Sequence, residues 1–185
     1  MDLLFKKLEA ITALSSPLKS YLASHIQRMP FGIHTYTPYQ TFNSCILYFV
    51  SSGYVGGITM NNTHGIPLVF FSQGDFIIPY LIKPKKTFVN ALTFYTPAVL
   101  LGISLPDARF ALEAFPEAID LFIEIIGEQI DNGNSRELLL RMPPQERYTD
   151  LLATKPRLLL HCKSQQIADY LNISKRQLVR FKRMH

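Results

Sequence analysis

The C-terminal segment constrains the fold of this chain most, because its residues fit two helices joined by a very short turn. Ile167, Ala168 and Leu171 recur at the spacing of one helical face. Asn172 follows, and asparagine tolerates the left-handed backbone conformation that a sharp turn needs. Ser174 is a residue type that commonly caps a helix N-terminus. The segment therefore predicts a first helix, a three-residue turn and a second helix that begins after Ser174.

The second of these helices is strongly basic. Leu178 and Phe181 are expected to point inward and the charged side chains mostly outward. Residues 155–185 carry a net charge of +7, whereas the rest of the chain carries −2. A local cationic surface suits a polyanion, because each phosphate contact releases condensed counterions. The pattern is typical of a helix-turn-helix unit that binds DNA. The alternative is a solvated basic tail.

Composition bounds the remainder of the chain. With 185 residues, 48% of them hydrophobic, it can bury one sizeable core and a small second unit. No apolar run reaches the roughly 18 to 20 residues that span a bilayer, and the N-terminus lacks a secretion signal, so we expect a soluble, cytoplasmic protein without a membrane partner. Cys45 and Cys162 show no metal-site spacing. We expect reduced thiols, no metal and no cofactor.

The first two-thirds of the chain change from helical to β-rich patterning. Two short helices are expected at residues 3–12 and 17–26, the second capped by Ser16. From about Phe31 to Ser104, short β-rich runs alternate with turn clusters rich in Gly, Asn and Ser. The expected strands are residues 45–50, 54–60, 66–71, 87–94 and 98–103. Such a series suggests a closed or two-sheet β-barrel of the jelly-roll type.

A long helix is expected to connect the β-rich unit to the basic end. After a short helix at 107–114, helical periodicity returns at Pro116 and extends to about residue 141, with a break or kink at 131–135. Leu121 and Ile125 extend its apolar stripe sideways, so the helix needs partners on more than one side. We expect it to pair with its copy in a two-fold dimer, the alternative being a core helix of a monomer. The stripe, and with it the expected dimer interface, consists of Ile119, Phe122, Ile123, Ile126 and Ile130.

The run Met142-Pro143-Pro144 is expected to form a hinge. It divides the chain into residues 1–142, a sensor unit with the long helix, and residues 143–185, the DNA-binding unit. A helix at 145–153 would open the second unit.

In this order, the elements resemble the Crp/Fnr family of bacterial transcription regulators over nearly the whole chain. The resemblance is carried by the segments SSGYVGG, FFSQGDF, FPEAIDLF, PPQERYTDLL and IADYLNISKRQLVR, of which the last is the most specific. It implies an α+β fold with an N-terminal barrel of the cyclic-nucleotide-binding type, a long dimerisation helix and a C-terminal helix-turn-helix domain.

The resemblance also implies a homodimeric transcription regulator whose partner is double-stranded DNA. An unidentified small-molecule effector and RNA polymerase are further candidate partners. Arg176 or Arg180 could form two hydrogen bonds to guanine. Family members often carry an acid at the position of Arg176, so the preferred base sequence is expected to differ. The residues expected on the DNA side are Ser174, Lys175, Arg176, Gln177, Arg180, Lys182 and Arg183.

The sensor unit departs from relatives that bind cyclic AMP. Ile78-Pro79 stands where they carry Gly-Glu, and Lys86-Thr87 where they carry Arg-Ser or Arg-Thr. Proline has no amide hydrogen and isoleucine adds a side chain where the backbone approaches the ligand, so we do not expect cyclic AMP to bind. Another anion could bind there, or the lysines could only solubilise an exposed hairpin. The candidate effector-binding residues are Lys83, Lys85, Lys86 and Thr87.

Enzymatic chemistry finds little support in the sequence. His34, His64, His161 and His185 are scattered, and we find no nucleophile elbow, phosphate-binding loop or paired acids. We therefore expect no catalytic residues. The rival interpretation is a cupin-like module that binds a small ligand or another protein and carries a non-specific basic tail; a cupin would need a cluster of His and Glu ligands, which we do not find.

Overall fold

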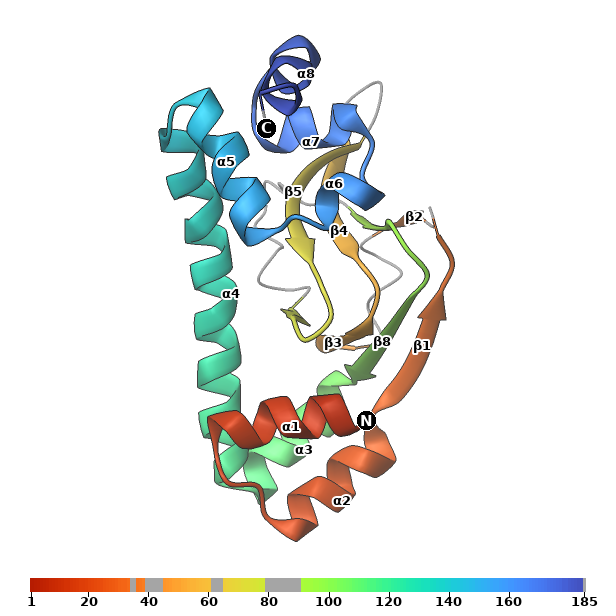
Figure 1. Cartoon of the computed structure of the whole chain (residues 1–185). Coiled ribbons are helices and arrows are strands. Elements are labelled where there is room, and N and C mark those ends of the chain that lie inside the picture. Colours follow the sequence, from red (N-terminus) through yellow and green to blue (C-terminus); the bar gives the residue numbers. More distant parts are fainter. Residues whose placement is uncertain (34–35, 39–44, 61–64, 79–90, 185) are drawn as a thin grey trace.

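The computed structural model describes residues 1–33, 36–38, 45–60, 65–78 and 91–184. Helices and antiparallel strands are arranged beside one long helix (Figure 1). The helices are α1 (Asp2–Ile11), α2 (Ser16–His25), α3 (Leu105–Ala114), α4 (Glu117–Arg141), α5 (Pro144–Thr154), α6 (Leu158–His161), α7 (Ser164–Tyr170) and α8 (Lys175–Lys182). The strands are β1 (Gln27–Phe31), β2 (Tyr36–Pro38), β3 (Leu47–Ser52), β4 (Val55–Met60), β5 (Gly65–Phe71), β6 (Phe76–Ile77), β7 (Ala91–Phe94) and β8 (Ala98–Ile103).

The strands form two four-stranded antiparallel sheets, in the orders β1-β8-β3-β6 and β2-β7-β4-β5. We call them the helix-side sheet and the α7-side sheet, because α7 contacts β5 of the second sheet. Tyr48 and Leu100 of the first sheet share one buried core with Val55 and Leu92 of the second. Ring stacking at 4.2 Å between Phe31 and Phe94 also joins the sheets. Within the described residues the hydrogen bonding does not close the strands into one barrel, which favours the two-sheet form of the predicted β-unit.

The two central strands of the helix-side sheet, β3 and β8, are buried on both faces. Along β3, Tyr48 and Val50 face the other sheet, whereas Phe49 between them packs against the helices. The same alternation places Leu100 and Leu101 of β8 in the two different cores. In Figure 1, α1, α2 and α3 gather at one end of this sheet, and α4 runs from them towards α5 at the opposite end.

The strand predictions are confirmed where the pattern was long and locally paired. Three short strands escaped the sequence pattern: β1 contains Pro30, β2 ends on Pro38, and β6 has only two residues. Proline and short length both weaken a strand pattern. Residues 87–90 of one predicted strand lie outside the described part of the chain, and the strand there begins at Ala91.

The predicted cap of α2 is wrong by one residue. The Oγ atom of Ser15, not of Ser16, accepts a hydrogen bond from the amide of Leu18 at 3.3 Å. A capping hydroxyl reaches the amide two or three positions ahead, so Ser15 serves Leu18 while Ser16 is already helical. Pro17 therefore occupies the second helical position.

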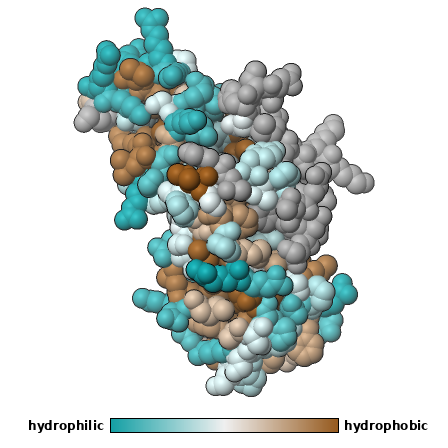
Figure 2. Space-filling model, turned by 90° about the vertical axis from the view of Figure 1, so that its right-hand side faces the viewer, coloured by the Kyte–Doolittle hydropathy of each residue, from teal (hydrophilic) through white to brown (hydrophobic). Residues whose placement is uncertain are grey.

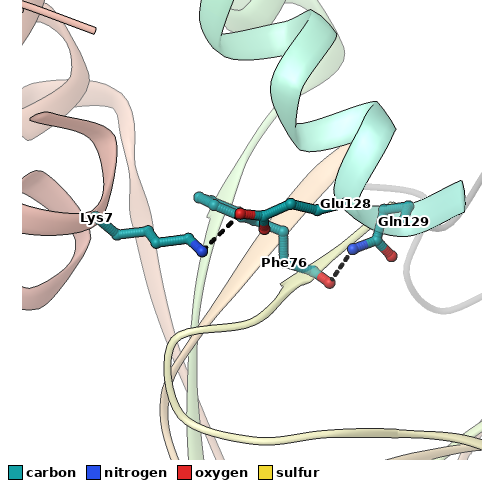
Figure 3. Close-up of polar contacts among 4 residues, drawn as sticks. All are labelled: Lys7, Phe76, Glu128 and Gln129. Atoms are coloured by element: carbon teal, nitrogen blue, oxygen red, sulfur yellow. Dashed lines mark hydrogen bonds and ion pairs between the residues drawn. The ribbon is translucent and has the colours of Figure 1, made fainter. Parts of the chain in front are cut away.

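The predicted break in the long helix is also wrong, because α4 continues without interruption from Glu117 to Arg141. Asn and Gly cost only about 0.5 to 1 kcal/mol each in a helix, and contacts on both sides of the segment outweigh that cost. The Nε2 atom of Gln129 donates to the carbonyl oxygen of Phe76 at 2.8 Å, as Figure 3 shows, and Leu139 is buried.

Candidate nucleic-acid interface

Helices α7 and α8 form the two-helix unit that the sequence predicts. The turn between them contains Asn172 with φ of 51°, within the left-handed region. The amide of Ile173 donates to the carbonyl oxygen of Ala168 at 3.0 Å, which closes the end of α7. Ala168 has no exposed surface, so its small side chain lies where the two helices meet. The predicted turn geometry is confirmed.

Ser174 caps α8, as its sequence position predicts. Its Oγ atom accepts from the amide of Gln177 at 3.1 Å, and the Oε1 atom of Gln177 accepts from the amide of Ser174 at 2.9 Å. This reciprocal pair is a capping box. The side-chain oxygen Oε1 of Gln177 is thereby engaged within the protein, so a base contact by this oxygen would compete with the cap.

Helix α8 is buried on one side and cationic on the other. Leu178 and Phe181 are 0% and 2% exposed, and the Phe181 ring stacks on Tyr148 of α5 at 6.0 Å. Figure 2 shows hydrophilic side chains gathered at the end of the molecule where Figure 1 places α8. The exposed predicted site residues are Ser174, Lys175, Arg176, Arg180, Lys182 and Arg183. The structure thus brings them onto one accessible end of the protein.

Arg147 of α5 is a positioning residue that the sequence analysis did not single out. Its Nε atom donates to the carbonyl oxygen of Met142 at 2.7 Å, and its Nη1 atom donates to those of Leu171 at 2.9 Å and Asn172 at 3.2 Å. One guanidinium therefore joins the end of α4 to the turn between α7 and α8. The sequence held only a weak signal for it, the segment PPQERYTDLL.

Helix α7 packs against the α7-side sheet through aromatic rings. The Tyr170 ring meets Phe70 of β5 edge-on at 4.7 Å, and Phe70 lies 5.6 Å from Tyr95. Arg136 of α4 lies over the Tyr170 ring at 5.6 Å, and burial lowers the pKa of this guanidinium. The first helix of the pair therefore supports the second from the protein side.

Near this junction the Cys162 side chain is buried and the Lys155 side chain is partly buried. Burial raises the pKa of the Cys162 thiol to about 12, which keeps the thiol protonated at neutral pH. Burial lowers the pKa of the Lys155 ammonium, an effect that the nearby carboxylates of Asp75 and Asp150 oppose. Lys155 thus lies near Asp75 and Asp150, and the cationic end formed by α8 does not include it.

The predicted dimer residues lie mostly on the outward side of α4. Ile119, Ile123 and Ile130 are 48%, 60% and 55% exposed. Leu121 and Ile125 are buried in the core between the helix-side sheet and helices α1 to α4, which we call the helix-side core. Phe122 is 36% exposed, and Ile126 is partly buried against the helix-side core. The stripe therefore has an open side, while the residues expected to extend it sideways form the buried face.

The candidate effector residues receive no structural description. Lys83, Lys85, Lys86 and Thr87 lie outside the described residues, as does Pro79. Ile78 is described, and its side chain is buried in the helix-side core at 4% exposure.

Two features would point to other functions: a cluster of metal-ligating side chains and a helix able to span a membrane. The described residues contain no group of three or more His, Cys, Asp or Glu side chains that could hold a metal ion, so no cupin-type ligand cluster is formed among them. None of the helices in this part of the chain combines the length and apolar character needed to cross a bilayer.

Comparison by structure places the fold beside regulators of the Crp/Fnr type, whereas no family model and no curated protein matches the sequence. A Crp/Fnr-family regulator from Eubacterium rectale is 12% identical, with a TM-score of 0.67 over 92% of this chain and 83% of that one. A cyclic-nucleotide-binding-domain protein from Listeria monocytogenes, also 12% identical, gives 0.69 over 90% and 86%. A cyclic-di-GMP-responsive global regulator from Xanthomonas campestris is 17% identical and gives 0.64 over 92% and 91%.

These neighbours confirm, at the level of fold, the resemblance that the sequence motifs indicate. The chain has the mixed helical and antiparallel architecture of Crp/Fnr-type regulators.

Proposed function

We propose that this protein is a homodimeric transcription regulator that reads double-stranded DNA with α8. The observation that carries the proposal is that α7 packs against the rest of the protein, whereas α8 presents exposed basic side chains. Tyr170 of α7 packs on the protein side, whereas Arg176 and Arg180 of α8 are exposed. Exposed guanidinium groups on the second helix of such a pair suit paired hydrogen bonds to guanine in the major groove.

The proposal assigns residues 1–142 to a sensor domain of the cyclic-nucleotide-binding type and residues 143–185 to a DNA-binding domain. The buried Ile78 supports the expectation that cyclic AMP is not the signal, because this side chain occupies the core where relatives carry glycine. The protein would act in the cytoplasm, with RNA polymerase as a candidate partner and no catalytic role. The barrel of the sensor would be of the jelly-roll type, since its two sheets share one core.

The dimer in this proposal forms through the outward side of α4. Ile119, Ile123 and Ile130 are exposed on it, and such a row of large apolar side chains is a suitable self-complementary surface. Ile123→Asp should convert the dimer into a monomer in sedimentation experiments. Leu105→Asp, which changes an exposed leucine on α3, is the matched control and should remain dimeric. A dimeric Ile123→Asp variant would contradict the proposed interface.

Selection of bound fragments from the source genome tests the function directly. A dimeric reader predicts an enriched palindromic site whose two halves lie about one helical turn, or 10 to 10.5 base pairs, apart. The purified protein should prefer that site over bulk DNA by about a thousandfold or more. Recovery of fragments without a shared sequence would favour the rival interpretation, a small-ligand or interaction module with a non-specific basic tail.

A further inference from the structure

An apolar cavity of about 100 Å³ lies between the helix-side sheet and the helices α1 to α4. All the side chains in its lining are hydrocarbon, among them Leu8, Leu18, Phe49 and Leu101. A cavity of this character stays dry, because a water molecule inside it would find no polar partners among these side chains. The same reasoning excludes charged and strongly polar ligands, which would lose their hydration without compensation.

Small residues on two helices leave this space open. Ala108 and Ala111 of α3 and Ala118 of α4 all line it. Leucine at one of these positions would fill much of the cavity. Because an unfilled apolar cavity lowers the free energy of unfolding, the natural alanines keep the space open at a cost in stability. The cavity also adjoins the outward side of α4, because Phe122 lines it and is 36% exposed.

Polar contacts tie α4 to two walls of the cavity. Lys7 of α1 forms an ion pair with Glu128 at 2.6 Å, and the neighbouring Gln129 bonds to the carbonyl oxygen of Phe76 at 2.8 Å (Figure 3). Both contacts follow within one helical turn of Ile125, which lines the cavity. Helix α4 is therefore coupled to the packing of α1 and β6 around the cavity.

We propose that this cavity is a binding site for a small, uncharged, apolar molecule and that it is the effector site of the protein. Occupancy would change the packing beneath Leu121 and Phe122, and so the outward surface of α4 through which the two subunits are proposed to meet. The effector role rests on the proposed DNA-binding function, whereas the binding site itself does not.

Xenon tests the binding site, because this atom enters dry apolar cavities. Methyl NMR spectra under xenon pressure, with nitrogen at equal pressure as control, should show saturable shifts for Leu8, Leu18 and Ile125. Ala111→Leu should abolish these shifts. Ala114→Leu, an exposed site on the same helix that does not line the cavity, should keep them. Absent shifts in the natural protein, or equal shifts in Ala111→Leu, would overturn the proposal.

The filled variants also test the effector role, since the added side chain mimics a permanently bound ligand. Ala111→Leu and Ala108→Leu should both change the affinity for the selected DNA site by about fivefold or more in the same direction, relative to Ala114→Leu. Ala108 is only partly buried, so its variant remains informative if Ala111→Leu fails to fold. Unchanged affinities would overturn the effector role. If the natural protein binds no DNA, the proposed function fails while the xenon result stays interpretable.

Discussion

Replacement of Arg147 by alanine should lower both the stability of the fold and the affinity for a specific DNA site, although this side chain contacts the protein backbone and not the exposed face of α8. The change removes three hydrogen bonds to the carbonyl oxygens of Met142, Leu171 and Asn172. Leu171 is fully buried, so its carbonyl oxygen would lose a charged donor at a cost of about 1 to 3 kcal/mol. The other two carbonyls belong to more exposed residues, whose groups can turn to water.

We therefore expect Arg147→Ala to lower the free energy of unfolding by about 2 kcal/mol, which corresponds to about 4 to 8 °C in Tm. Arg147→Lys should lose about half as much, because lysine retains the charge but not the fork of donors. Affinity for the selected site should fall by about tenfold while binding to bulk DNA changes little, since the residue acts through the turn that carries α8.

Arg141→Ala is the matched control for this prediction. Arg141 forms an exposed pair with Glu137 at 2.8 Å, four residues earlier on the same helix. Such pairs contribute about 0.3 to 0.5 kcal/mol, so thermal denaturation should barely change. The reasoning is refuted if the Arg147→Ala and Arg141→Ala variants lose equal stability, or if Arg147→Ala weakens binding to bulk DNA as much as specific binding.

Three further predictions concern the backbone and the buried thiol. Gly53→Ala should destabilise the fold by about 1 to 3 kcal/mol more than Gly74→Ala in urea denaturation. Both glycines have φ of 97°, but a Cβ atom at Gly53 would lie 2.6 Å from the Cβ atom of Ala98, whereas a Cβ atom at Gly74 would meet nothing within 4 Å. Equal losses of stability would show that the contact with Ala98 is irrelevant. Asn172→Gly should be nearly neutral and Asn172→Val should cost about 1 to 2 kcal/mol, because φ is 51° there; a neutral valine would contradict the turn geometry. The pKa of Cys162 is raised from 9.0 to about 12 in the fold, so ionisation of the thiol favours the unfolded chain and the free energy of unfolding should fall as pH rises from about 9 to 12. Cys162→Ala should reduce this dependence of stability on pH. An unchanged dependence would contradict the raised pKa of Cys162.

The part of the fold that follows from the sequence is the part built by neighbours along the chain. The turn at Asn172, the cap at Ser174 and the buried Leu178 and Phe181 depend on residues within about ten positions of one another, so local propensity and periodicity suffice. The exposed isoleucines of α4 likewise follow from helical periodicity.

Contacts between distant residues account for the features that the sequence did not reveal. The Phe70–Tyr170 contact joins positions a hundred residues apart, and no local pattern announces such a pair. The uninterrupted α4 is a second case, because Gln129 and Leu139 stabilise a segment whose own residues favour a break. The cavity is a third case, because no local pattern distinguishes its alanines; the space forms only where four helices and a sheet meet.

The most direct measurement of the central claim compares specific and bulk DNA affinity across salt concentrations for three variants. Arg176→Ala and Arg180→Ala should each weaken binding to the selected site, and at least one should cost about 1 to 3 kcal/mol and relax the preference at one base position. Arg109→Ala, an exposed arginine on α3 at the far end of the molecule, should leave both affinities unchanged. If both α8 variants bind the selected site as tightly as the natural protein does, α8 is not the reading helix.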